Sequence, residues 1–168
     1  MPTMPAIRPL TQADVNTIFE LADAIWRKHY PGIISPEQIE YMLAQRYRPA
    51  LIEAQLASAG IWWNKLTLDE EIIGFSCCLL TNTVGELKLD KLYIHTHHQR
   101  KGYGAMLIEE AMKTARENHC TRLVLAVNKN NHAAIAAYRR YGFKISGAVV
   151  TDIGNGFVMD DIIMAHTL

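Results

Sequence analysis

The stretch LDKLYIHTHHQRKGYGAML, residues 89–107, joins an apolar segment to a loop, two glycines and an amphipathic segment. The apolar part, Glu86–Ile94, is typical of a central strand that is covered on both faces. The segment Gly102–His119 predicts a helix, because its apolar residues recur at helical spacing. The order of strand, glycine loop and helix indicates a mixed α/β fold around this unit.

The start of that helix is a predicted anion site. The first turn of a helix leaves several backbone N–H groups without partners, and together with the helix dipole they attract negative charge. Gly102 and Gly104 carry no side chain, so a phosphate can approach the backbone closely. Arg100 and Lys101 add positive charge beside it. We therefore expect a phosphate or pyrophosphate to bind here.

Two common nucleotide motifs do not fit the glycine loop. The dinucleotide fingerprint needs a third glycine, and Leu107 stands at that position. It also needs an acidic residue about 20 residues later at a strand end, which the sequence lacks. The Gly-Lys-Ser/Thr ending of a P-loop is absent as well.

The loop does match the Q/R-x-x-G-x-G/A pattern of the GNAT family of N-acetyltransferases, which Gln99, Gly102 and Gly104 resemble position by position. A second likeness follows in NKNNHAAIAAYRRYGF, residues 128–143, where this family often has an Asn and a Tyr before a Gly-Phe pair. The matching residues there are Asn131, Tyr138, Gly142 and Phe143. The matching region runs from about residue 86 to 143, and the element order fits over nearly the whole chain.

This resemblance implies an enzyme that uses acetyl-CoA as co-substrate and binds no metal. Strand-edge backbone groups should meet the pantetheine arm and the thioester, the glycine loop should hold the pyrophosphate, Asn131 should bond the coenzyme, and Tyr138 should lie beside the sulfur. The residues expected at the coenzyme are Leu92, Tyr93, Ile94, Gln99, Arg100, Lys101, Gly102, Tyr103, Gly104, Ala105, Asn131 and Tyr138. Two alternatives stay open: Tyr138 as a core residue, and Asn131 as a helix cap only.

The expected reaction is direct attack of an amine on the thioester, with Tyr138 as general acid for the leaving thiolate. The general base is expected to be Asp90 or Glu86, which share strand parity with Ile94 and so should share its face. Some relatives place a Glu where this chain has Ala126. Asp90 has a second interpretation, as a structural ion-pair partner of Lys88 or Arg100.

The sequence does not decide which amine accepts the acetyl group. Details such as GNGFVMDDIIM resemble the polyamine-acetylating PaiA-type branch, which implies a polyamine or other small amine. A protein α-amine or lysine is the alternative, and a coenzyme A-binding module without catalysis is a third. In this family the first helices often wall the acceptor site, so Trp26, His29 and Tyr30 are candidates to shape it. Asp160 and Asp161 either meet a cationic acceptor or are edge charges.

The rest of the sequence predicts one domain over residues 1–168, with a central, mostly antiparallel mixed sheet of about seven strands and four to five helices. The other predicted strands are Ala6–Leu10, Ile61–Leu68, Ile72–Leu80, Arg122–Val127, Lys144–Asp152 and Gly156–His166. The other predicted helices start after Thr11, start after Ser35, span Pro49–Ala59 and span Asn131–Tyr141.

Composition narrows the function further. Lys plus Arg and Asp plus Glu both count 17, so the chain has no basic excess for nucleic acid. We find no signal peptide and no apolar stretch near 20 residues, so a cytoplasmic protein without a membrane segment is expected. His95, His97 and His98 are interpreted as solvated loop residues. A homodimer is expected, since relatives are often dimers and a net charge near zero fits self-association.

Overall fold

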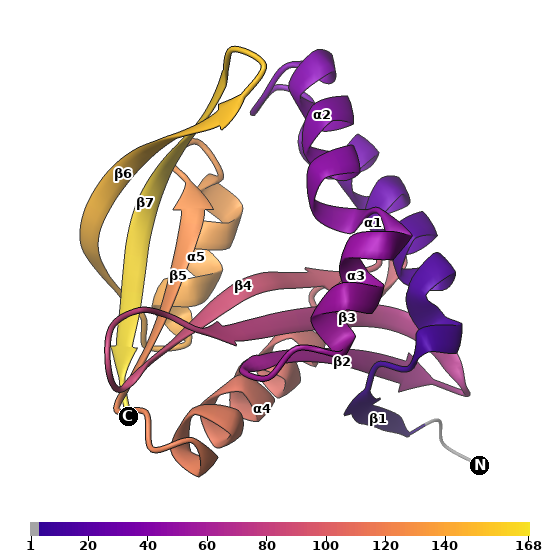
Figure 1. The fold of residues 1–168 in the computed structure, drawn as a ribbon, viewed down its shortest axis with the longest axis vertical. Coiled ribbons are helices and arrows are strands. Elements are labelled where there is room, and N and C mark those ends of the chain that lie inside the picture. Colours follow the sequence, from indigo (N-terminus) through magenta and orange to yellow (C-terminus); the bar gives the residue numbers. More distant parts are fainter. Residues whose placement is uncertain (1–3) are drawn as a thin grey trace.

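The computed structural model describes residues 4–168 and contains a seven-stranded sheet in the order β1-β2-β3-β4-β5-β7-β6. All neighbouring strands are antiparallel except β4 and β5, which run parallel. This arrangement confirms the predicted mixed, mostly antiparallel sheet (Figure 1). The strands are β1 Pro5–Pro9, β2 Ile61–Leu68, β3 Glu71–Leu80, β4 Glu86–Ile94, β5 Arg122–Asn128, β6 Lys144–Gly154 and β7 Phe157–Thr167.

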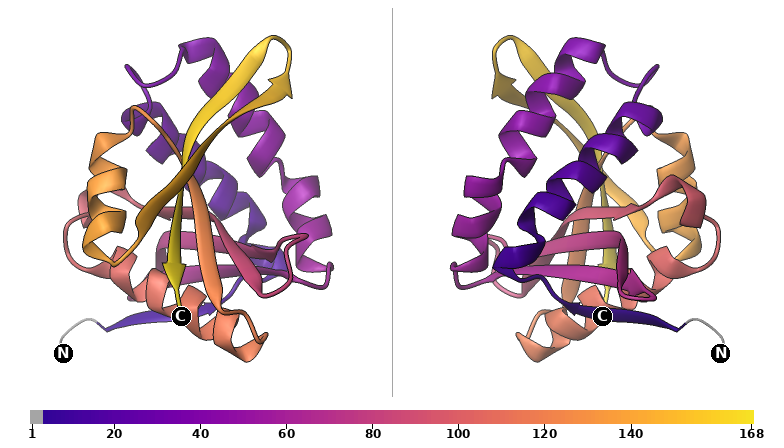
Figure 2. Two further views of the ribbon diagram at one scale, coloured as in Figure 1. Left: turned by 90° about the vertical axis from the view of Figure 1, so that its left-hand side faces the viewer. Right: turned by 90° about the vertical axis from the view of Figure 1, so that its right-hand side faces the viewer.

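In the part of the chain that the structure describes, five α-helices pack around this sheet. They are α1 Val15–His29, α2 Pro36–Tyr47, α3 Pro49–Leu56, α4 Tyr103–Glu117 and α5 His132–Arg140, with short 3-10 turns at Gln12–Asp14 and Thr96–His98. Helices α1, α2 and α3 lie over one face of β2, β3 and β4, and α4 lies along the opposite face (Figures 1 and 2). Within residues 4–168, no helix combines the length and apolar character needed to cross a bilayer.

Local signals set the starts of the first two long helices. The Thr11 backbone N–H donates to the Asp14 carboxylate at 2.9 Å, as the predicted capping box requires. Asp14 also pairs with Lys65 on β2 at 2.7 Å, which ties the start of α1 to the sheet. The Ser35 hydroxyl accepts the Gln38 N–H at 3.1 Å and caps α2.

Strands β4 and β5 pair over only three residues and then separate. Glu86 lies opposite Arg122 and Lys88 opposite Val124, whereas the rest of each strand has no partner in the other. The two strands diverge visibly in Figure 1. This split leaves the backbone edge of β4 beyond Lys88 free of a β5 ladder, in the middle of the fold.

Strand β4 also contains a bulge at Asp90. Cys77 pairs with Lys91 and Cys78 with Leu89, so Asp90 has no partner in β3. The extra residue reverses which face the following side chains take. Ile94 packs with Leu107 on the α4 side, whereas Asp90 contacts Arg46 of α2 on the other side. The prediction that Asp90 and Ile94 share a face is therefore wrong, because strand parity holds only without a bulge.

The β6–β7 hairpin reaches over to α2 (Figure 1). Gln38 donates to the carbonyl of Val158 at 2.7 Å, and the Tyr41 hydroxyl donates to the carbonyl of Ile153 at 2.5 Å. Gly154 has φ +94°, and a Cβ there would lie 2.6 Å from the Tyr41 hydroxyl. The hairpin tip therefore closes against α2, with a glycine at the contact.

Candidate active site

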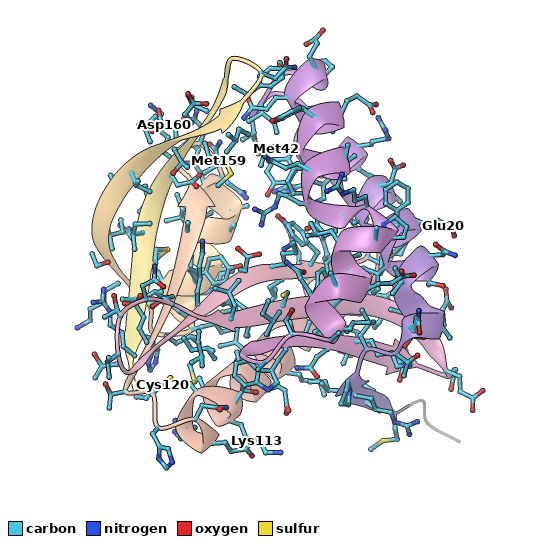
Figure 3. All side chains as sticks on the ribbon, in the orientation of Figure 1. Glu20, Met42, Lys113, Cys120, Met159 and Asp160 are labelled. Carbon is cyan, nitrogen blue, oxygen red and sulfur yellow. The ribbon has the colours of Figure 1, made fainter. Side chains whose placement is uncertain are left out.

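A cavity of about 860 Å³ lies where β4 and β5 separate. The walls come from α1 and α2, from β4 and β5, from the glycine loop with the start of α4, and from α5 and β7. Met42 of α2 and Met159 of β7 both line it and lie at the gap between α2 and the hairpin (Figure 3). The cavity thus joins the glycine loop to the region beneath the hairpin tip.

The glycine loop has the backbone geometry that an anion site needs. Gly102 is the N-cap of α4 with φ +85°, and a Cβ added there would meet nothing within 4 Å. The first backbone bond of the helix runs from the Met106 N–H to the Gly102 carbonyl at 3.4 Å. The N–H groups of residues 103–105 precede it and have no helical acceptor. The predicted anion site is therefore a real helix start beside the cavity.

Gln99 fixes the entrance to that loop. Its side-chain amide donates to the Ile94 carbonyl at 3.1 Å, which joins the end of β4 to the loop. Arg100 has φ +62°, an uncommon conformation for a residue with a side chain, and it lines the cavity. The first residue of the family pattern therefore has a structural role in shaping the turn.

The structure brings most of the predicted site residues to one place. Those that line the cavity are Asp90, Leu92, Tyr93, Ile94, Gln99, Arg100, Gly104, Asn131 and Tyr138. Lys101, Gly102, Tyr103 and Ala105 form the adjoining loop and first helical turn. Glu86 does not line it; this residue borders a second, smaller cavity of about 250 Å³, which Asp161 also lines.

Helix α5 places Asn131 and Tyr138 along the cavity. The Asn131 side-chain oxygen accepts the Ala134 N–H at 3.4 Å and so caps the helix. The same oxygen lies 3.1 Å from the His29 Nε2 atom on α1, across the cavity. Asn131 therefore caps α5 and also connects it to α1. Its side-chain amide nitrogen has no hydrogen-bond partner within residues 4–168.

Tyr138 lies seven residues further along α5, with its ring 5.7 Å from that of Phe143. Burial raises the pKa of the Tyr138 hydroxyl above its ordinary value. A tyrosine with its ordinary pKa of about 10 is already protonated at neutral pH, so this shift leaves the hydroxyl protonated and makes it a weaker acid. Tyr141, one helical turn away, lines the cavity beside Gly104, where a Cβ would lie 3.7 Å from its hydroxyl.

Aromatic side chains wall the end of the cavity that lies beneath α1. The Tyr30 hydroxyl lies 2.8 Å from the Tyr93 hydroxyl, which joins α1 to β4. The Trp26 ring packs 4.4 Å from Tyr30 and 5.9 Å from Tyr93, measured between ring centroids. Trp26, His29 and Tyr30 all line the cavity, and Trp26 and Tyr30 are also part of the buried core.

Asp90 is held in a buried ion-pair network. Its carboxylate lies 2.6 Å from Lys91 Nζ, 3.5 Å from Arg46 Nη2 and 3.6 Å from Lys88 Nζ. Although burial alone would raise the pKa of Asp90, Lys91, Arg46 and Lys88 together hold it below its ordinary value. This geometry supports the interpretation of Asp90 as a structural ion-pair partner, and its cations include Lys88.

Asp161 of β7 is the residue that the list of predicted site residues lacks. It is 6% exposed and lines the cavity, and within residues 4–168 no cation lies within ion-pair distance of its carboxylate. Burial raises the pKa of Asp161, and the more distant charges of Arg46 and Lys88 offset part of that effect. Its neighbour Asp160 instead pairs with Lys129 at 2.5 Å. The sequence signal for Asp161 was a charged residue within the otherwise apolar stretch GFVMDDIIM.

Comparison with known proteins gives a consistent result. The sequence model of the Acetyltransferase (GNAT) family matches residues 16–143. A spermidine N(1)-acetyltransferase of Thermoplasma acidophilum is 28% identical over 158 residues, which cover 92% of this chain and 94% of that protein. A peptidyl-lysine N-acetyltransferase of Salmonella typhimurium is 31% identical over 143 residues, which cover 83% and 87%.

The fold is also similar to that of solved structures. The crystal structure of the PaiA N-acetyltransferase of Thermoplasma acidophilum in complex with coenzyme A superposes with a TM-score of 0.86 at 25% identity. The superposition covers 98% of this chain and 99% of that one.

Proposed function

The chain belongs to the acetyltransferase (GNAT) family and is an acetyl-CoA-dependent N-acetyltransferase, and we propose that its acceptor is a small primary amine. A diamine or polyamine is the class we favour, and we assign the activity to residues 1–168 acting as one domain. The observation that carries the proposal is one cavity lined by the glycine loop before α4, by Asn131 and Tyr138 of α5 and by the Asp161 carboxylate.

The part of the cavity formed by the glycine loop and β4 suits acetyl-CoA, the coenzyme that the family uses. The unpaired N–H groups at the start of α4 match a pyrophosphate, and the absence of a Cβ at Gly102 keeps the approach open. The free edge of β4 offers backbone groups near Leu92 and Ile94 to an extended amide-containing arm. Acetyl-CoA supplies the activated acetyl group, and these residues orient it.

The acceptor end suits a small molecule better than a protein chain. The contacts from Gln38 and Tyr41 to the backbone of the hairpin close the space between α2 and β7. A peptide would need an open groove, and these bonds hold α2 against the hairpin at one side of the cavity. The buried Asp161 carboxylate offers an ion-pair partner to an ammonium group. Without such a partner, transfer of the charged group from water into a buried site would cost free energy.

Asp161 also suits the role of proton acceptor better than Asp90 or Glu86. An alkylammonium ion has a pKa of about 10 and must lose a proton before its nitrogen can attack. The lowered pKa of Asp90 and its three cationic partners make it a weak base. Asp161 has no ion-pair partner within residues 4–168 and its pKa is raised by burial, so it accepts a proton more readily than Asp90.

Tyr138 is the proposed proton donor to the leaving thiolate. Its hydroxyl is protonated at neutral pH, as that of any tyrosine is, and the residue lies on the wall of the cavity. A thiol has a pKa of about 8.5, below that of the hydroxyl, so the role requires that the proton moves as the C–S bond breaks and that a proton from the attacking amine then restores the tyrosine.

A panel of amines tests the acceptor class. Release of free thiol from acetyl-CoA would be measured with putrescine, spermidine, spermine, lysine and a lysine-containing peptide at equal concentration. We expect turnover with the diamine and polyamines and little with the peptide. Preferential turnover of the peptide would instead support the protein-lysine alternative, which the Salmonella relative favours. Binding of acetyl-CoA without transfer to any amine would support a non-catalytic module.

A further inference from the structure

A hydrogen bond connects α1 to α5 near the carboxyl ends of β4 and β5, where the two strands have separated. The Nε2 atom of His29, the last residue of α1, lies 3.1 Å from the Oδ1 atom of Asn131, the N-cap of α5. Tyr30, next to His29, bonds Tyr93 near the end of β4. Asn131 follows the end of β5 by three residues. Both His29 and Asn131 line the cavity, so this bond lies at the site itself.

The contacts of Asn131 decide which atom of its side-chain amide is the oxygen. One atom receives the Ala134 N–H at 3.4 Å and caps the helix, so that atom must be the acceptor oxygen. The His29 Nε2 atom faces the same oxygen, and a carbonyl oxygen can only accept, so Nε2 carries the hydrogen and donates it. His29 therefore adds a second donor to an oxygen that the helix alone holds by one long bond.

The nitrogen of the same amide is left open to the cavity. Asn131 is 5% exposed and lines the cavity, so its small exposed part faces that space. Among the described residues, the fully buried side-chain N and O atoms without a hydrogen-bond partner belong to Trp26, Arg46, Tyr47 and His98. The Nδ2 atom of Asn131 has no partner and is not one of them. It is therefore an accessible N–H donor on the cavity wall.

The backbone that carries Asn131 is held on both sides. The Asn131 N–H donates to the Asn128 carbonyl at 2.9 Å, and its own carbonyl accepts the Ile135 N–H at 3.1 Å. The Asn130 N–H donates to the Asn128 side-chain oxygen at 2.9 Å. The freedom that remains to Asn131 is rotation of its side chain, and the bond from His29 restricts that rotation.

We propose that His29 is a positioning residue for coenzyme binding. By donating to Oδ1 it holds the Asn131 amide so that Nδ2 donates to an acceptor oxygen of bound acetyl-CoA. The inference rests on the proposed function, in which acetyl-CoA occupies this cavity. A side chain that is ordered before binding loses less conformational entropy in the complex. This role differs from the acceptor-wall role that the sequence suggested for His29.

Calorimetry with coenzyme A and steady-state kinetics with the best amine of the panel test this role. His29→Leu removes the donor and should lower coenzyme A affinity about fivefold, raise KM for acetyl-CoA similarly and change kcat by less than about twofold. His29→Gln offers an amide N–H near the position of Nε2 and should recover most of the affinity. Lys28→Leu, at the exposed neighbouring position of α1, is the matched control and should change neither value.

A double-variant cycle separates orientation from capping. Asn131→Ser keeps a good N-cap but removes the amide nitrogen, so it should weaken coenzyme A binding and leave the melting temperature nearly unchanged. In that background His29→Leu should have no further effect on affinity, because no amide is left to orient.

Three results would overturn the proposal. They are unchanged affinity in His29→Leu, full affinity in Asn131→Ser, and equal losses for His29→Leu in both backgrounds. A wild-type chain that binds no coenzyme A would overturn the proposed function itself, and this inference with it.

Discussion

The Nζ atom of Lys91 lies 2.6 Å from the Oδ2 atom of Asp90, its neighbour in the chain. Consecutive residues on a regular strand point to opposite faces, so this ion pair depends on the bulge at Asp90. The bulge turns Lys91 into the core, where its Nζ atom lies 5.1 Å from the centroid of the Trp63 ring. Burial of this lysine is tolerated because the carboxylate beside it and the aromatic faces around it offset the loss of water.

Removal of the Asp90 charge should destabilise the fold. Asp90→Asn leaves Lys91 buried without its counter-ion, and breaking a buried pair of this kind costs about 3 kcal/mol. Urea denaturation at pH 7 would measure the free energy of unfolding. Lys88→Ala is the matched control, since Lys88 lies further from Asp90 and is one-third exposed, and its effect should stay below about 1 kcal/mol.

The pH dependence of that effect follows from the direction of the pKa shift. The pKa of Asp90 is lowered in the folded state, so the stability it contributes is fully present above the ordinary value of 3.8. That stability is lost as the pH falls through the lower folded-state pKa. The difference in unfolding free energy between wild type and Asp90→Asn should therefore be constant near neutrality and shrink below pH 3.8. A difference that shrinks between pH 8 and 6 would contradict this account.

A pH–rate profile should distinguish the roles of Asp90 and Asp161. Asp161→Asn should lower kcat/KM by roughly 100-fold and remove its acidic limb, because the proposed proton acceptor is lost. That limb should lie above the ordinary carboxyl range in wild type, since burial raises the pKa of Asp161. Asp90→Asn should keep the limb unshifted. If Asp90→Asn abolishes the limb and Asp161→Asn does not, the earlier prediction for Asp90 holds instead.

Loss of the Tyr138 hydroxyl should affect turnover and leave binding nearly intact. Tyr138→Phe keeps the ring against Phe143 but removes the proton donor, so kcat should fall by roughly 100-fold. Acetyl-CoA affinity, measured by calorimetry, should change little. Tyr141→Phe removes a hydroxyl beside Gly104 from the residue that caps the C-terminus of α5, and should spare kcat. Full activity of Tyr138→Phe would assign Tyr138 a packing role only.

Adding one methyl group at the start of α4 should separate coenzyme binding from stability. At Gly104 a new Cβ would make ordinary contacts, 3.7 Å from the Tyr141 hydroxyl and 3.9 Å from Leu92. Alanine is favoured over glycine inside a helix, so the melting temperature of Gly104→Ala should stay equal or rise. Coenzyme A affinity should fall by roughly tenfold, about 1.4 kcal/mol, because the methyl group obstructs the phosphate. Unchanged affinity would move the pyrophosphate away from this turn.

Loosening the contact between α2 and the hairpin should widen the range of acceptors. Gln38→Ala and Tyr41→Phe together remove the bonds to the carbonyls of Val158 and Ile153. Activity on the lysine-containing peptide should rise relative to activity on spermidine, as read from the ratio of kcat/KM values. Thr83→Ala, in a turn outside the cavity, is the control and should leave the ratio unchanged. An unaltered ratio in the double variant would mean that these bonds do not restrict the acceptor.

Several elements followed from local patterns alone. The predicted strands Ile61–Leu68 and Glu86–Ile94 coincide with β2 and β4, and the predicted start of α2 coincides with its Ser35 cap. Caps, turns and periodicity act over a few residues, so the sequence carries them directly. The glycine loop belongs to this class, because a left-handed Gly102 before a helix needs only its neighbours.

Other features depend on partners far away in the chain. The sequence predicted Asp90 as a base and left Asp161 undecided between an acceptor contact and an edge charge. The bulge that redirects β4 arises from its register against β3, and Asp161 reaches the cavity only because β7 inserts between β5 and β6. The chain's local chemistry thus specified the glycine loop before α4, whereas strand pairing across long separations brought Asp161 to the cavity and placed Asp90 in an ion-pair network. Strand register is a property of two segments together, and neither segment encodes it alone.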